Sequence, residues 1–104
     1  MENETKYIIS GEFKVKAEYR QTLIEMSLKL IPLSMQEAGC ISYSFLEDKA
    51  REGHFLFFER WRSRKDIALH FDKPYFMSFA NEFPNMIEGD ATIEIHQITT
   101  TETV

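Results

Sequence analysis

Hydrophobic and polar residues alternate over residues 6–16 of the chain, KYIISGEFKVK. A period of two predicts a β-strand with one face towards a core. The apolar face carries Tyr7, Ile9, Gly11, Phe13 and Val15. Because glycine has no side chain to pack, Gly11 predicts a bulge or the close approach of another group.

The next segment, residues 17–39, changes to helical spacing. Its apolar stripe consists of Tyr19, Leu23, Met26, Leu30 and Leu33. Gly39 is well placed to end this helix. Pro32 lies inside the pattern and lacks a backbone donor, which predicts a kink or a break there.

Two strands follow, at residues 40–48 and 53–61, joined by a hairpin turn in the sequence KAREG. A short helix is predicted at residues 63–71, with Ser63 as its N-cap, and a second over residues 72–87, with Pro74 in its first turn. Residues 90–98 form the last strand. The order predicts an α+β, ferredoxin-like β-α-β-β-α-β fold: a four-stranded antiparallel sheet with helices on one face.

The strand at residues 54–61 has large apolar side chains on both faces. One face carries Phe55, Phe57, Glu59 and Trp61, and the other carries His54, Leu56, Phe58 and Arg60. An antiparallel sheet with one face in water is apolar on one side only. The pattern therefore predicts that the open face meets a second copy of the chain, which would give a homodimer in the form of a dimeric α+β barrel.

Length and charge limit the classes of function. With 104 residues, the chain predicts a single domain spanning residues 1–104, with an ordered core at about 6–99. The net charge of -5 argues against a nucleic-acid partner and against an anionic membrane surface. The chain has no apolar run of ~18 residues, its N-terminus lacks the pattern of a signal peptide, and a lone cysteine suits a reducing compartment. These features predict a cytoplasmic protein with no membrane partner, and Cys40 is expected to be a small buried hydrophobe.

The run from Glu37 to Phe79 resembles the antibiotic biosynthesis monooxygenase domain. The similarity rests on a glycine followed by cysteine, a strand with a tyrosine, a strand ending in Glu-x-Trp, and a helix with a histidine. In this chain those positions are Gly39, Cys40, Tyr43, Glu59, Trp61 and His70. Two departures stand out: Lys73, Pro74 and Tyr75 occupy the place where relatives often have a second histidine, and the first strand lacks the asparagine of haem-degrading relatives.

The resemblance implies a cofactor-independent monooxygenase that oxidises a quinol-like or polycyclic aromatic substrate with molecular oxygen. Isomerases of a small phosphorylated signalling sugar occur in the same family, and that alternative stays open. So does a third interpretation, a non-catalytic small-molecule-binding dimer whose pocket is filled by its own aromatic residues.

Among the candidate residues, His70 is expected to be the catalytic group, because an imidazole takes a proton near neutral pH. Its alternative role is a structural histidine on an apolar helix. The expected substrate-binding residues are Trp61, Tyr43, Tyr75, Glu59 and Phe79. Trp61 could instead pack in the core, and Phe79 belongs to an aromatic stripe whose spacing also suits core packing.

Glu59 is close in the sequence to Arg60 and Arg62, which favours an ion-paired structural residue, although it shares a strand face with Trp61 and could orient a histidine. The basic run Arg60–Lys65 could instead attract an anionic substrate, which would favour the sugar-phosphate alternative. No residues show the spacing of a metal site, and no metal or other cofactor is predicted.

Overall fold

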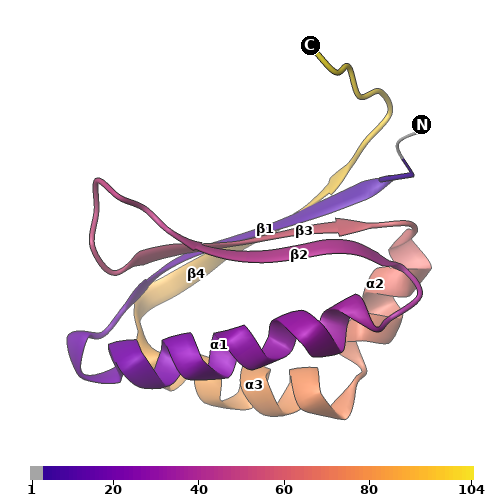
Figure 1. Ribbon diagram of the computed structural model, residues 1–104. Coiled ribbons are helices and arrows are strands. Elements are labelled where there is room, and N and C mark those ends of the chain that lie inside the picture. The colour runs from indigo at the N-terminus through magenta and orange to yellow at the C-terminus, as the bar shows by residue number, and fades with distance from the viewer. Residues whose placement is uncertain (1–3) are drawn as a thin grey trace.

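The computed structural model describes residues 4–104, which form one antiparallel sheet with helices on one face (Figure 1). The elements in chain order are β1 (Tyr7–Val15), the 3₁₀ turn η1 (Ala17–Tyr19), α1 (Arg20–Met35), β2 (Cys40–Glu47), β3 (His54–Trp61), α2 (Arg64–Phe71), α3 (Pro74–Met86) and β4 (Ile87–Gln97). Across the sheet the strand order is β2-β3-β1-β4, with each neighbouring pair antiparallel. The predicted ferredoxin-like α+β fold is confirmed.

The alternation in β1 places its apolar face against the helices, as predicted. Ile9, Phe13 and Val15 are buried. The pairing of β1 with β4 shifts register between Glu12 and Lys14, two residues beyond the position expected from the sequence. A β-carbon added at Gly11 would make only ordinary contacts, 3.7 Å from Cβ of Phe57, so crowding does not require glycine there.

Helix α1 runs through Pro32 without interruption, so the predicted break does not occur. Pro32 and Leu28, four residues earlier, are both exposed. Water can therefore reach the carbonyl that loses its backbone partner to the proline. The buried face of the helix also differs from the predicted stripe. Leu23 and Leu30 are buried as predicted, together with two serines, Ser27 and Ser34. Tyr19 and Leu33, which the stripe included, are exposed.

Gly39 does not end this helix, because the last helical residue is Met35. A different constraint acts on Gly39. A β-carbon there would lie 2.1 Å from Cγ of Asp66, well inside contact distance. The glycine thus lets the chain before β2 pass against the first turn of α2.

The last strand begins at Ile87, three residues earlier than predicted, whereas three other local predictions are confirmed. Ser63 caps α2 by accepting a hydrogen bond from the backbone N–H of Asp66 at 3.0 Å. Pro74 lies in the first turn of α3. Cys40 is buried at the start of β2, and burial raises the pKa of its thiol to about 12.

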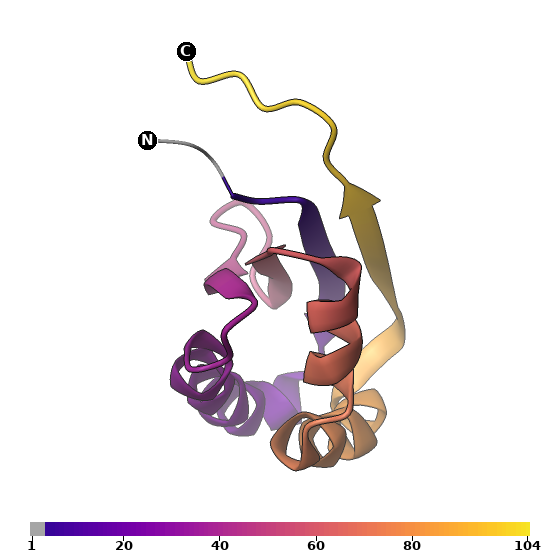
Figure 2. The same ribbon diagram turned by 90° about the vertical axis from the view of Figure 1, so that its right-hand side faces the viewer.

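The helices lie on a single face of the sheet, with α1 and α3 side by side (Figures 1 and 2). Strand β4 is at the sheet edge, and its residues Ile93 and Ile95 are exposed. Beyond β4 the chain extends away from the body of the molecule in both views. None of the helices in the described part is long and apolar enough to cross a membrane.

Candidate active site

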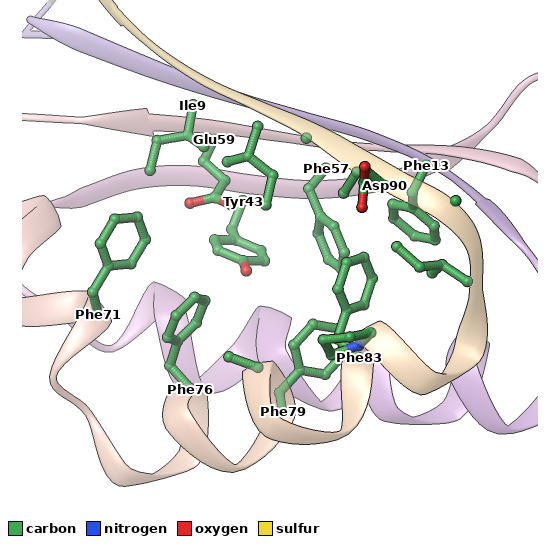
Figure 3. Close-up of a pocket in the computed structure, with 17 residues that line it drawn as sticks. Ile9, Phe13, Tyr43, Phe57, Glu59, Phe71, Phe76, Phe79, Phe83 and Asp90 are labelled. Atoms are coloured by element: carbon green, nitrogen blue, oxygen red, sulfur yellow. The ribbon is translucent and has the colours of Figure 1, made fainter.

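A cavity of about 710 Å³ lies between the sheet and α3 (Figure 3). Its walls are mainly apolar. They are formed by Ile9, Gly11, Phe13, Tyr43, Phe57, Glu59, Phe71, Phe76, Phe79, Ala80, Phe83, Pro84, Ile87, Gly89, Asp90, Ala91 and Ile93. The sheet supplies one wall because the residues of β1 and β3 that face the helices alternate along each strand.

Two acidic residues, and no lysine, arginine or histidine, belong to this lining. Asp90 is exposed on β4, next to Gly89, whose φ of 63° favours glycine. Glu59 comes from β3 and is only 5% exposed. The cavity therefore has a single buried carboxyl group.

The Glu59 side chain descends from the sheet into the space between Tyr43 and Phe71 (Figure 3). One carboxylate oxygen, Oε1, accepts a hydrogen bond from Nε1 of Trp61 at 3.0 Å. The bond is possible because alternate residues of a strand share a face. No basic side chain of the described residues forms a salt bridge with Glu59. The predicted ion pairing with the neighbouring arginines is therefore absent, and Arg60 and Arg62 are exposed.

Burial raises the pKa of Glu59 to about 7, since removal from water disfavours the charged form. Hydrogen bonds from Trp61 and Tyr43 act in the opposite direction, and the charge of Glu37 adds to the rise. A carboxyl group with this pKa exists in both protonation states near neutral pH, which suits it to accept and return a proton.

His70 is fully buried at 0% exposed and lies behind the cavity wall rather than on it. Its ring centroid is 4.7 Å from the ring of Trp61 and 4.7 Å from that of Phe76. Phe76 lines the cavity and its ring lies against that of His70, which is not itself part of the lining.

A hydrogen-bonded network holds His70 from the other side. Its Nδ1 lies 2.7 Å from Oε2 of Glu37, and the hydroxyl of Tyr75 donates to the same oxygen. The Ser34 hydroxyl lies 3.2 Å from that of Tyr75, and because Tyr75 donates its proton to Glu37, Ser34 donates to Tyr75. The network joins α1, the loop before β2, α2 and α3.

The contact with Glu37 defines the proton arrangement on the imidazole of His70. When Nδ1–H donates to a carboxylate, the neutral ring has its lone pair on Nε2. Within residues 4–104 this Nε2 is buried and has no hydrogen-bond partner. Burial lowers the pKa of His70, although the Glu37 carboxylate partly opposes that effect.

The six residues singled out in the sequence thus lie in two layers. Tyr43, Glu59 and Phe79 line the cavity, whereas Trp61, His70 and Tyr75 stand behind its wall. The hydroxyl pKa of Tyr43 is raised strongly, first by burial, so this group stays a neutral hydrogen-bonding phenol. Sequence reasoning missed Glu37 and Ser34, because a loop glutamate and a helical serine carry no signal of a shared network.

No cluster of three or more potential metal ligands (His, Cys, Asp or Glu) occurs among residues 4–104. The ionisable groups at and behind the cavity wall include three carboxyl groups (Glu37, Glu59 and Asp90), two phenols and one imidazole, arranged around an aromatic cavity. This set can bind a flat apolar ligand and exchange a proton with a polar group on it.

Comparison with known proteins agrees with this architecture. A family model described as antibiotic biosynthesis monooxygenase matches residues 6–82. The chain belongs to the antibiotic biosynthesis monooxygenase family. The match runs from β1 into α3 and includes all six residues discussed above.

Individual relatives extend the comparison. The uncharacterized protein sll1783 of Synechocystis is 40% identical over 97 residues, which are 93% of this chain and 66% of that protein. The chain thus spans slightly less than two thirds of this curated relative. The structure of Rv0793 from Mycobacterium tuberculosis has a TM-score of 0.88 at 19% identity, covering 95% of this chain and 100% of the other. A structure described as antibiotic biosynthesis monooxygenase has a TM-score of 0.83 at 20% identity, covering 90% and 99% of the two chains.

Proposed function

We propose that this protein is a cofactor-independent monooxygenase that oxidises a neutral quinol-like or polycyclic aromatic substrate with molecular oxygen. The observation that carries the proposal is the lining of the cavity: phenylalanine rings on most sides, one buried carboxyl group and no cationic residue. Aromatic walls favour a flat apolar ligand through offset and edge-to-face contacts.

The same observation weighs against an isomerase of a phosphorylated sugar. A phosphate group needs cationic or backbone donors, and an acidic, apolar cavity would repel it. The basic run Arg60–Lys65 cannot supply those donors, because none of its residues lines the cavity and its arginines and lysine are exposed. For the third alternative, a non-catalytic dimer whose pocket is filled by its own aromatic residues, the open volume of about 710 Å³ disfavours the filled pocket.

The chemistry needs an electron-rich substrate. Removing the proton of a phenol or enol concentrates electron density on the ring, which can then reduce oxygen without a resident redox group. For an anthrone, one atom of O₂ becomes the new carbonyl oxygen at the ring CH₂. The other atom leaves as water with the two hydrogens.

Two groups are candidates for the proton acceptor. His70, expected from the sequence, offers an unprotonated Nε2 and would reach a ligand after a movement of Phe76. Glu59 offers a carboxyl group already on the cavity wall. In either case Tyr43 and Phe79 contact the substrate, while Trp61 and Tyr75 position the acceptor.

The proposal includes a homodimer located in the cytoplasm. Its support is the uncovered face of the sheet, where Leu46 is 50% exposed and faces the same way as Leu56 and Phe58. Burying these side chains against a second copy would remove apolar surface from water.

Oxygen consumption tests the function. The purified protein, treated with chelator and free of flavin, is mixed with dihydroxyanthrone or a naphthohydroquinone, and oxygen uptake is followed with an electrode. We expect uptake above the uncatalysed rate, with no product formed under strict anaerobiosis. Turnover of a sugar phosphate without oxygen would contradict the proposal.

A matched pair of variants tests whether the reaction takes place in the cavity. Ala91→Phe places a ring at the cavity wall, whereas Ala68→Phe places one on the exposed surface of α2. We expect the first to abolish most of the uptake and the second to retain it. Equal activity of the two variants would place the reaction elsewhere.

A further inference from the structure

Two groups near the cavity, Glu59 and His70, could exchange a proton with the ligand, and membership of the family does not decide between them. Glu59 and His70 are both buried, but they differ in access to the cavity. Glu59 lines the cavity, and His70 does not.

The partners of each group also differ. His70 has its Nδ1 committed to Glu37, and the rings of Trp61 and Phe76 lie against its imidazole. Glu59 has one oxygen committed to Trp61, which fixes the orientation of the carboxyl group while the side chain extends into the cavity (Figure 3).

We propose that Glu59, and not His70, is the catalytic residue that accepts the hydroxyl proton of the bound aromatic ligand, and that Trp61 and the Glu37–His70–Tyr75 network position it. This inference rests on the function proposed above. In the step, the O–H bond of the ligand breaks, its electron pair stays on the ligand oxygen, and the proton forms a carboxylic acid on Glu59. Glu59 then gives this proton to the O₂-derived oxygen atom that leaves as water, which restores the carboxylate.

The network gives Glu59 its position through packing. His70 lies against the Trp61 ring, and Trp61 holds the Glu59 carboxylate through Nε1. His70 is in turn tied to Glu37 and Tyr75. A chain of contacts thus runs from α1 and α3 to the one carboxyl group in the cavity.

The groups that pack around Glu59 in the described part of the chain supply no counter-ion, so near neutral pH the carboxyl group exists both as the acid and as the carboxylate that can accept a proton. Tyr43 and Cys40 of β2 have raised pKa values and stay uncharged. The pKa of His70 on α2 is lowered, and the side chains that β1 and α3 contribute to the cavity wall are apolar. Two carboxylates face the site: Glu37, which raises the pKa of Glu59, and the exposed Asp90 of β4. An uncharged aromatic ligand can therefore enter without displacing a counter-ion.

The first test compares the pH dependence of kcat/KM for dihydroxyanthrone oxidation in three proteins. In the native protein we expect kcat/KM to rise with pH through about 7, as the pKa of Glu59 requires for a base that must be ionised. Glu59→Gln, which keeps an acceptor for Trp61, should lose ~10²–10⁴-fold and the rising limb with it. His70→Asn, which keeps a donor for Glu37, should lose no more than about ten-fold and retain the limb.

A Glu59→Gln variant with native rate and native pH profile would overturn the proposal. So would a His70→Asn variant that alone abolishes the rising limb. Far-ultraviolet circular dichroism and the thermal midpoint of each variant confirm that the protein is folded before rates are compared.

The second test does not depend on turnover and separates this inference from the proposed function. Calorimetry measures the affinity for naphthol and for methoxynaphthalene, which has the same ring but no hydroxyl proton. We expect the ratio of affinities to favour naphthol increasingly as the pH rises through about 7, and to be independent of pH in Glu59→Gln.

The two tests have distinguishable failures. If no anthrone or quinol consumes oxygen but the naphthol preference follows Glu59, the monooxygenase function is wrong and the ligand contact stands. If oxygen is consumed but neither rate nor preference responds to Glu59→Gln, the function stands and the assignment of Glu59 is wrong.

Discussion

Glu59 illustrates how a residue's environment decides its chemistry. Arg60 follows it directly and Arg62 lies three residues after it, and such charges would hold a carboxyl group ionised at the surface. In the fold those arginines are exposed, and Glu59 is buried beside Trp61 and an aromatic cavity. Desolvation then dominates, and the pKa rises instead of falling.

The raised pKa has a consequence for stability. A glutamate titrates near 4.5 in the unfolded chain and Glu59 at about 7 in the fold, so between these values the folded state holds a proton that the unfolded chain has lost. The contribution of Glu59 to the free energy of unfolding therefore falls as the pH rises from about 4.5 to about 7 and is level outside that window.

Glu59→Gln removes this titration while keeping the hydrogen bond to Trp61. The difference in free energy of unfolding between the variant and the native protein should shift by about 3 kcal/mol in favour of the variant when the pH is raised from about 4 to about 8, as the shift in the pKa of Glu59 implies. Urea unfolding of both proteins at the two pH values measures the difference, and other titrating groups cancel in the comparison. A difference that does not change with pH would show that Glu59 is not a strongly desolvated carboxyl group.

At the scale of elements, α1 shows where hydrophobic periodicity misleads. The helix buries positions 23, 27, 30 and 34, which have the expected helical spacing, but two of them are serines. A small polar residue can occupy a buried position where a neighbouring element comes close. The apolar stripe read from the sequence was therefore rotated, and its outer members Tyr19 and Leu33 are exposed.

Replacing the two buried serines of α1 with alanine should have opposite effects on stability. Within residues 4–104 the Ser27 hydroxyl has no hydrogen-bond partner, whereas Ser34 bonds to Tyr75. Ser27→Ala should stabilise the protein by about 0.5–1 kcal/mol, since it removes an unsatisfied hydroxyl and alanine favours a helix. Ser34→Ala should destabilise it by about 1 kcal/mol through the lost hydrogen bond. Chemical denaturation measures both, and equal effects would mean that the hydrogen bond of Ser34 has no energetic weight.

For the whole molecule, the exposed sheet face is the feature that a single chain leaves unexplained. Leu46 and Leu28 are similarly exposed, at 50% and 51%, but Leu46 lies on β2 beside Leu56 and Leu28 lies on α1. A surface leucine on a helix needs no partner, whereas an apolar group on a sheet face is typical of an interface.

Light scattering tests the homodimer. The native protein should have twice the chain mass of 12.3 kDa at micromolar concentration. Leu46→Glu should shift it towards the monomer, because two such charges would face each other across a two-fold contact. Leu28→Glu changes the same residue type at the same exposure and should leave the mass doubled. A native protein with the mass of one chain would contradict the prediction.

The sequence by itself determined the elements and their order. Alternation in β1 and β3, the Ser63 cap and Pro74 act within a few residues, so local pattern suffices to predict them. It also indicated three cavity residues, Tyr43, Glu59 and Phe79, through family resemblance and strand or helix position.

Only the tertiary structure decided which side chains meet. One hydrogen-bonded network joins Ser34, Glu37 and Tyr75, which lie up to 41 positions apart in the chain. Position 39 requires glycine because a β-carbon there would collide with the Asp66 side chain, not because a helix ends there. The same packing left His70 off the cavity wall, against the ring of Phe76, and placed Glu59 on that wall. Access and desolvation depend on contacts between distant segments, and these are the properties that decide which acid or base can act.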